Sequence, residues 1–212
     1  MGAPSVSVIE CPGCGFPQSS PSARNCEQCG NLLLVNFLSD LDSFDEKGIR
    51  AYIRNYKELL HNHPDDAELN CAMGICNLDL GLFERARDYF MTAIELMPES
   101  AEPYYYSALS LLKGRRPQVV TLTEIREAEK YLGVAIKIDD SRAKYHYLWA
   151  LIKYDFYIKN GLRAASPTVD EALQNACVCE HDDREVENML ARVGVDDADI
   201  LAAVKSSARY ST

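Results

Sequence analysis

Residues Asn70 to Pro98, NCAMGICNLDLGLFERARDYFMTAIELMP, decide the fold of this chain. The stretch predicts two amphipathic helices joined by a tight turn at Gly81. Gly74, in the first of these helices, allows another helix to approach closely. One face of the second helix carries small and large apolar side chains at helical spacing: Ala86, Phe90 and Ala93. A single hairpin of this kind cannot bury its own apolar face, so the chain must supply neighbours on each side.

Two further hairpins follow along the chain. The second begins near Ala101 and carries an insertion of about eight residues between its helices, around Lys113–Val120. The insertion contains two adjacent basic residues, Arg115 and Arg116, which indicate either a functional face or a solvated turn. The third hairpin opens with a long helix rich in aromatic side chains, Ala143–Asn160.

This arrangement resembles the tetratricopeptide repeat (TPR), a helix–turn–helix unit of about 34 residues. The small residue that Ala86 provides in the first hairpin is matched by Ala128 in the second and by Ala172 in the third. Helices after residue 181 are expected to cap the exposed end of the array. The resemblance implies an all-α fold, a TPR-like α-solenoid of about three helical hairpins plus capping helices.

Two Cys-x-x-Cys pairs stand near the start of the chain, Cys11 with Cys14 and Cys26 with Cys29. Two such pairs at this separation can bring four thiolates to a tetrahedral centre. The segment between them has almost no apolar residues, so it needs a metal ion as its core. The stretch resembles a zinc ribbon, which implies one structural Zn²⁺ held by the four cysteines. Two disulfides and a rubredoxin-like iron site are the alternatives, and a cytoplasmic chain without an aromatic shell around the cysteines disfavours both.

A four-cysteine site is closed and leaves no open position for catalysis. Zinc ribbons bind nucleic acid or protein, and nucleic-acid binding requires basic side chains. Arg24 is the only basic residue in 1–40, and the whole chain has a net charge of −10. We therefore expect a structural or docking role for the zinc ribbon, without contact to nucleic acid or to an anionic membrane.

These features divide the chain into segments. We expect a flexible leader at 1–9, the zinc ribbon at 10–31, a linker with an N-terminal capping helix at 32–64, TPR-like repeats at 65–181, and capping helices with a tail at 182–212. The apolar run Leu32–Leu38 should pack on the first helix. Removal of zinc should then melt residues 1–35 and leave the helical array folded.

In TPR proteins the first helices of successive hairpins line a concave groove that holds a peptide or a partner helix. Carried over to this chain, the groove would be lined by aromatic, aliphatic and basic side chains: Tyr105, Leu109, Leu112, Lys113, Tyr147, Leu151 and Tyr154. Tyrosine offers a large contact area with one polar group, which suits peptide recognition. The alternative is that these side chains are core residues. The Lys, Arg and Asn side chains with which some TPR domains clamp a chaperone tail are not present as a set on this surface.

Cys177, Cys179 and His181 are a second group of metal-ligating residue types. On a helix, positions two apart point about 200° apart and cannot share an ion. These side chains can converge only if the helix ends before Cys179, so the spacing disfavours a second metal site.

No catalytic signature accompanies these modules. The sequence has no phosphate-binding loop, dinucleotide fingerprint, nucleophile elbow or kinase motif. It also shows no secretory signal and no membrane-spanning run. We therefore expect a cytoplasmic, non-enzymatic adaptor or scaffold that binds a peptide or partner protein through the TPR groove, with the zinc ribbon as a second docking module. The alternative is a nucleic-acid-associated protein whose zinc ribbon contacts RNA or DNA.

Overall fold

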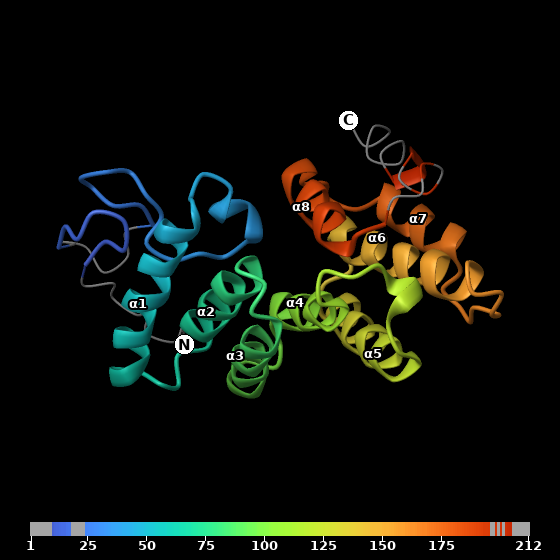
Figure 1. Ribbon diagram of the computed structural model, residues 1–212, viewed down its shortest axis with the longest axis horizontal. Coiled ribbons are helices and arrows are strands. Elements are labelled where there is room, and N and C mark those ends of the chain that lie inside the picture. The colour runs from blue at the N-terminus through green and yellow to red at the C-terminus, as the bar shows by residue number, and fades with distance from the viewer. Residues whose placement is uncertain (1–9, 18–23, 196–197, 199, 201, 205–212) are drawn as a thin grey trace. The chain divides into compact units, whose positions relative to one another are not determined.

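The computed structural model describes residues 10–17, 24–195, 198, 200 and 202–204. Their regular secondary structure is helical, with isolated β-bridges only, so the expected all-α fold is confirmed. The chain forms two compact units, Met1–Pro98 (unit 1) and Glu99–Thr212 (unit 2), whose helices are labelled in Figure 1. The boundary falls inside 65–181, which the sequence predicts as one array, so the first hairpin belongs to a different unit from the other two.

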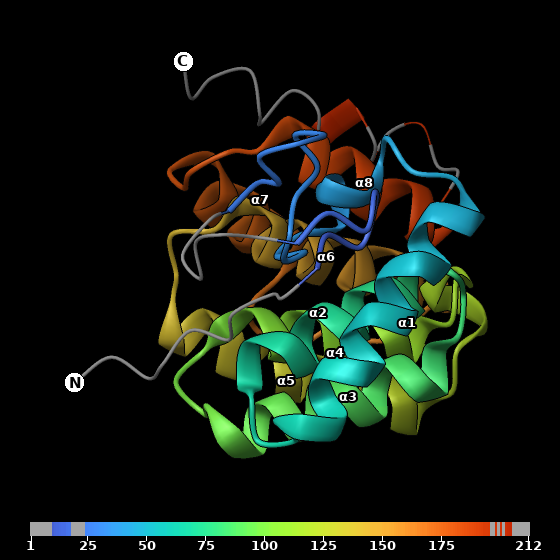
Figure 2. The same cartoon turned by 90° about the vertical axis from the view of Figure 1, so that its left-hand side faces the viewer.

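Unit 1 contains η1 (Leu38–Leu41), α1 (Glu46–Asn62), α2 (Ala67–Asp79) and α3 (Phe83–Leu96). Aspartates cap α1 and α2, because Asp45 accepts the amide hydrogen of Gly48 at 2.8 Å and Asp66 accepts that of Leu69 at 2.8 Å. Gly81 makes the predicted turn between α2 and α3 with a φ of 70°. α2 packs against both α1 and α3, and the two views show these helices side by side (Figures 1 and 2).

The crossing of α2 and α3 is built around Gly74. The ring of Phe90 lies against this glycine, and a Cβ atom at Gly74 would meet three ring atoms at 2.4, 2.6 and 2.9 Å. Phe90 is fully buried, as are Ala86 and Ala93 on the same face of α3. The predicted close approach at Gly74 is confirmed, because a side chain there would displace either the ring or the helix.

The apolar run Leu32–Leu38 connects the cysteine segment to α1. The Tyr52 hydroxyl donates to the Leu32 carbonyl oxygen at 2.6 Å, and the Val35 amide donates to the Tyr56 hydroxyl oxygen at 3.0 Å. Both tyrosines are fully buried. The prediction that this run packs on the first helix is therefore confirmed, and two buried hydroxyls satisfy its backbone groups.

Between residues 99 and 195, unit 2 contains α4 (Ala101–Leu112), η2 (Pro117–Val119), α5 (Leu122–Ile138), α6 (Ala143–Ile152), η3 (Lys153–Ile158), α7 (Val169–Cys177) and α8 (Asp183–Val193). α4 packs against α5, and α6 packs against α7, which gives the two predicted hairpins. Threonine caps begin both second helices, Thr121 with Glu124 in α5 and Thr168 with Glu171 in α7.

Unit 2 also departs from the sequence prediction. The helix expected over 143–160 changes at Lys153 into a π-helical segment, η3. α8 does not cap the last hairpin alone but contacts α4 and α6, the first helices of both hairpins. The reason is that α8 has one apolar face, with Val186 and Met189 buried, and α4 and α6 are apolar on nearly every side. The predicted leader at 1–9 and the final tail lie outside the described residues.

Candidate metal centre and partner-binding residues

The four predicted metal ligands, Cys11, Cys14, Cys26 and Cys29, converge on one point in unit 1. Their sulfur atoms all lie within 4.8 Å of one another. The Sγ atoms of Cys11 and Cys29 are 3.6 Å apart, as are those of Cys14 and Cys26. A tetrahedron with metal–sulfur bonds of about 2.3 Å has edges of about 3.8 Å. The sulfur positions therefore fit one tetrahedral metal ion.

Both halves of this site have the same local backbone. The glycine after each pair donates its amide hydrogen to the carbonyl oxygen of the first cysteine, Gly15 to Cys11 at 2.8 Å and Gly30 to Cys26 at 2.9 Å. Both glycines have a positive φ, 72° and 75°, which a residue with a Cβ atom adopts only with strain. The Cys-x-x-Cys-Gly pattern thus specifies the same turn twice, and the two turns face each other across the sulfurs.

Amide groups and burial both act on the sulfur atoms. The Gly13 amide lies 3.3 Å from Cys11 Sγ, and the Gln28 amide lies 3.4 Å from Cys26 Sγ, so each donates to a ligand sulfur. Burial raises the pKa of the Cys11 thiol to about 12. Four sulfurs complete the tetrahedron, which suits a structural ion.

The second cysteine–histidine group has a different arrangement. His181 Nε2 lies 2.6 Å from the Tyr147 hydroxyl oxygen, and its Nδ1 lies 2.9 Å from the Cys179 carbonyl oxygen. The Cys179 thiol donates to the Asn175 carbonyl oxygen at 3.0 Å. Both ring nitrogens are therefore engaged within the fold, and Cys177 lies in the last turn of α7.

The structure places most of the predicted groove residues in the interior. Five of the seven have at most 2% of their surface exposed: Tyr105, Leu109, Leu112, Tyr147 and Leu151. Lys113 and Tyr154 are partly exposed. α4 and α6 are apolar on nearly every side, and a helix of this kind is buried in the core. The all-round apolar character of these two helices is visible in the sequence, and it favours the alternative that these side chains are core residues. Their role in partner binding stays a prediction.

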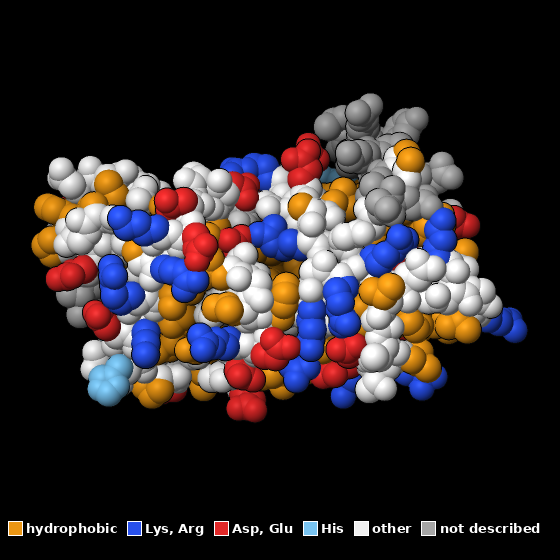
Figure 3. All heavy atoms as spheres, in the orientation of Figure 1, with side chains coloured by type: hydrophobic (Ala, Val, Ile, Leu, Met, Phe, Trp, Pro, Cys, Tyr) orange, Lys and Arg blue, Asp and Glu red, His pale blue; other side chains and the backbone are white. Residues whose placement is uncertain are grey.

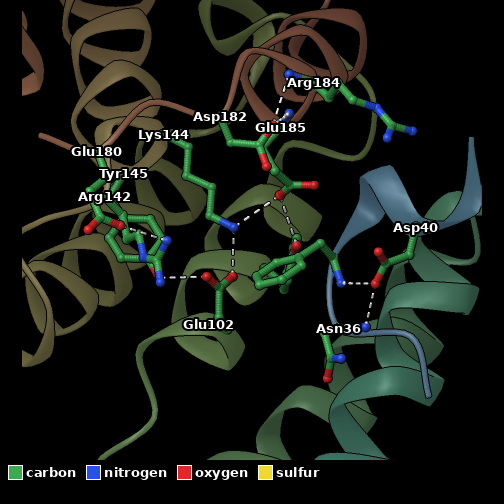
Figure 4. Close-up of polar contacts among 12 residues, drawn as sticks. Asn36, Asp40, Glu102, Arg142, Lys144, Tyr145, Glu180, Asp182, Arg184 and Glu185 are labelled. Atoms are coloured by element: carbon green, nitrogen blue, oxygen red, sulfur yellow. Dashed lines mark hydrogen bonds and ion pairs between the residues drawn. The ribbon is translucent and has the colours of Figure 1, made fainter. Parts of the chain in front are cut away.

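A buried charged cluster, absent from the sequence prediction, fastens α8 to α4 and α6. Lys144 Nζ donates to Glu102 Oε2 at 2.9 Å and to Glu185 Oε2 at 3.0 Å, as Figure 4 shows. Glu185 also accepts a hydrogen bond from the Tyr106 hydroxyl at 3.2 Å. Lys144 is 6% exposed and Glu185 is 4% exposed, so loss of either partner would leave a buried charge poorly compensated. These residues come from three helices, and no local spacing could link them.

The insertion of the second hairpin is fixed to the π-helical segment by an ion pair. Arg116 Nη2 lies 2.6 Å from Oδ1 of Asp155, whose side chain is fully buried. Asp155 also accepts the Gln118 amide hydrogen at 2.8 Å. Arg115 lies 3.5 Å from Glu124, the capping-box residue of α5. Arg116 therefore anchors the loop, while Arg115 and Val119 of the same loop are exposed.

Unit 1 has a hollow of about 500 Å³ between α1, α2 and α3, which we call the α1–α3 hollow. Side chains from all three helices line it: Ile53, Lys57, Met73, Asn77, Arg85, Asp88 and Tyr89. Its size falls within the range of ligand sites, about 300–1,000 Å³. Over these helices, Figure 3 shows Lys and Arg side chains with hydrophobic side chains between them. The lining offers apolar and charged contacts but no nucleophile beside a base, so it suits binding more than chemistry.

Comparisons with known proteins add the following. No protein-family model matches the chain, and no curated protein matches it. Among solved structures, the chain is similar to one described as the crystal structure of MamA, with 18% sequence identity and a TM-score of 0.48. That match covers 84% of this chain and 94% of the other. In the described part of the chain, no helix is both long enough and apolar enough to span a membrane.

Proposed function

We propose that this chain is a non-enzymatic protein-interaction adaptor, built from TPR-like helical hairpins and held together near its N-terminus by one structural Zn²⁺. The lining of the α1–α3 hollow carries the proposal. It combines buried Met73 with the exposed cations Lys57 and Arg85, a set of side chains that binds a partner through contact area and charge. The four-cysteine group supports it as a closed site that stabilises structure.

The metal is proposed to be zinc because four cysteine ligands in a closed tetrahedron are typical of structural Zn²⁺ sites. The thiol ligands must stay reduced, which fits the cytoplasm. Elemental analysis of the purified chain tests this assignment. One equivalent of zinc in a colourless protein is expected. One equivalent of iron, with the visible colour of an iron–thiolate centre, would show that the site holds iron and not zinc.

The finer expectation concerns the concave groove lined by Tyr105 and Tyr147. Because both side chains are buried, a partner can reach them only if the packing around α4 and α6 opens, and α8 is one of the helices in contact with both. The variant Tyr154→Ala, at a groove residue that is only half-buried, should then weaken binding of the partner while keeping its helical circular dichroism, whereas Tyr105→Ala/Tyr147→Ala removes two core side chains and should destabilise unit 2. A partner that binds Tyr154→Ala as it binds the wild type would eliminate the groove as its site.

The adaptor function is tested with purified components. Proteins retained by the immobilised, zinc-loaded full chain are identified by mass spectrometry, and each is then purified and titrated by calorimetry. A partner with a Kd of about 10 µM or tighter supports the proposal. If no retained protein binds the purified chain, the proposal fails. Gel retardation of RNA and DNA at low salt tests the nucleic-acid alternative, for which a net charge of −10 predicts no shift.

A further inference from the structure

The floor of the α1–α3 hollow is apolar and has one polar group. Met73 is 1% exposed and Asn77 is 3% exposed, and both come from α2. Ile53 of α1 adds half-buried aliphatic surface. The Asn77 side-chain nitrogen donates to the Met73 carbonyl oxygen at 2.7 Å, so the amide oxygen is the atom with which Asn77 can accept a hydrogen bond from a ligand. The floor can therefore hold an apolar side chain and one donor group.

The rim of the hollow carries more positive than negative charge. Lys57 comes from α1 and Arg85 from α3, and both side chains are exposed. Within the described ranges, neither forms an ion pair. Asp88 is the single carboxylate in the lining, which leaves the lining with one net positive charge. Two exposed cations that form no ion pair within the described ranges, at the mouth of an apolar hollow, favour an anionic ligand.

The charge of α1 supports the same conclusion. Its sequence, EKGIRAYIRNYKELLHN, has four basic and two acidic residues, a net of +2, in a chain whose net charge is −10. Arg50 is paired with Glu46 at 2.6 Å, one turn away on the same helix. Lys57, three turns from the start of α1, forms no ion pair with another described residue and lines the hollow. α1 therefore carries a local excess of positive charge, and Lys57 brings one of its cations to the hollow.

We propose that the α1–α3 hollow binds a short segment of a partner protein in which an apolar side chain stands next to one or two carboxylates. The proposal rests on the adaptor function proposed above and names the chemistry of its partner. The apolar side chain packs on Met73 and Ile53. A carboxylate pairs with Arg85, whose planar fork can hold both oxygens, and with Lys57. Tyr89, half-buried in the lining, adds contact area and one hydroxyl.

Other ligand classes fit the hollow less well. Two cations can neutralise only about two phosphates, whereas stable nucleic-acid binding uses several more. A membrane surface requires a broad apolar face, and the floor of this hollow is recessed and contains buried Asn77. A peptide segment offers an apolar side chain, a carboxylate and a backbone N–H for the Asn77 oxygen within a few residues of one another.

The test is a selection with random peptides displayed on phage, using the full, zinc-loaded chain. Peptides selected on the wild type are then synthesised and titrated against the charge-reversed variant Lys57→Glu/Arg85→Glu. The enriched peptides should carry Asp or Glu next to apolar residues. Their affinity should fall by about tenfold or more in the variant, because two attractive charges become repulsive. Helical circular dichroism and zinc content should stay unchanged, since both side chains are exposed.

The matched control is Arg54→Glu/Arg87→Glu. It makes the same charge change on the same two helices, but neither residue lines the hollow. Peptide affinity should fall by less than about threefold in this control. Equal losses of peptide affinity in the two variants would mean that the effect comes from the overall charge of the protein and not from the hollow, and would overturn the inference. Enrichment of neutral or basic peptides, or no enrichment, would also overturn it.

Two further outcomes separate this inference from the adaptor function. If a purified protein partner binds Lys57→Glu/Arg85→Glu as tightly as the wild type, the adaptor function stands and the hollow is not its site. If sedimentation shows that the wild-type chain self-associates and that this variant does not, the occupant is a second copy of the chain. That result would replace the acidic partner proposed here.

Discussion

The substitution Gly74→Ala tests the packing on which unit 1 depends. A Cβ atom at this position would lie 2.4, 2.6 and 2.9 Å from three ring atoms of Phe90, far inside the usual carbon–carbon contact of about 3.5–4.0 Å. Phe90 is fully buried between Ala86 and Ala93, so its ring has no open space to enter. The new methyl group must therefore displace the ring or separate α2 from α3.

The expected cost follows from two opposing effects. Overpacking a core costs about 1–3 kcal/mol, and three contacts this short place Gly74→Ala in the upper part of that range. Replacing glycine by alanine inside a helix contributes about 1 kcal/mol in the opposite direction. We therefore expect the free energy of unfolding to fall by about 1–2 kcal/mol. For a unit of about 100 residues, such as unit 1, each kcal/mol lost from the free energy of unfolding lowers Tm by about 4–8 °C.

The assay is urea denaturation of the zinc-loaded chain, followed by circular dichroism at constant zinc. Gly133→Ala in α5 is the matched control, because its Cβ atom would lie at an ordinary 3.5 Å from the Trp149 ring. The control should gain up to about 1 kcal/mol from helix propensity. In the double variant Gly74→Ala/Phe90→Leu, the two losses should be less than additive, since the smaller side chain relieves the clash. If Gly74→Ala is as stable as the control, the packing argument is wrong.

Three further predictions concern the metal, the charged cluster and pH. Chelation of the metal should remove hydrogen-exchange protection from residues 10–17 and 24–35 and leave that of α2 and α3, whereas loss of most helical circular dichroism would contradict this independence. Glu185→Gln should lower the free energy of unfolding by about 2–3 kcal/mol, because buried Lys144 loses one of its two carboxylates. The control Glu180→Gln, at an exposed ion pair, should change it by less than about 0.5 kcal/mol. Equal effects of the two substitutions would show that the buried cluster does not hold α8 in place. A hydrogen bond from the Ser141 hydroxyl lowers the pKa of the Asp139 carboxyl below its ordinary value of 3.8. The contribution of this carboxylate to stability is therefore present above that pH and is lost as pH falls through the folded pKa. Asp139→Asn should make the dependence of stability on pH between about pH 5 and pH 2 less steep, and an unchanged slope of the acid unfolding curve would refute this role.

Several elements could be predicted because their information is local. The four cysteines converge because each Cys-x-x-Cys-Gly pattern forms the same turn, with Gly15 and Gly30 at positive φ. Gly74 and Gly81 were identified from the same short stretch, since helix phase and turn residues are read over a few positions. The apolar face of α3 belongs to this class as well.

The groove residues show where local reading fails. Tyr105 and Tyr147 lie at the positions that the TPR resemblance assigns to a binding face, yet both are buried. The amphipathic period indicates which side of a helix is apolar, but it does not indicate which other element will cover that side. In unit 2, α8 contacts the helices that carry these tyrosines, and it comes from a segment far along the chain.

The sequence by itself therefore determined the all-α class, the hairpins and the four-cysteine ligand set, because helix periodicity, turn glycines and ligand spacing act over a few residues. Only the tertiary structure decided which surfaces remain accessible. The pairs Lys144–Glu185 and Arg116–Asp155 join residues 41 and 39 positions apart, and the α1–α3 hollow collects side chains from three helices. Such contacts depend on how whole helices pack, and burial and charge pairing are consequences of that packing that no short pattern contains.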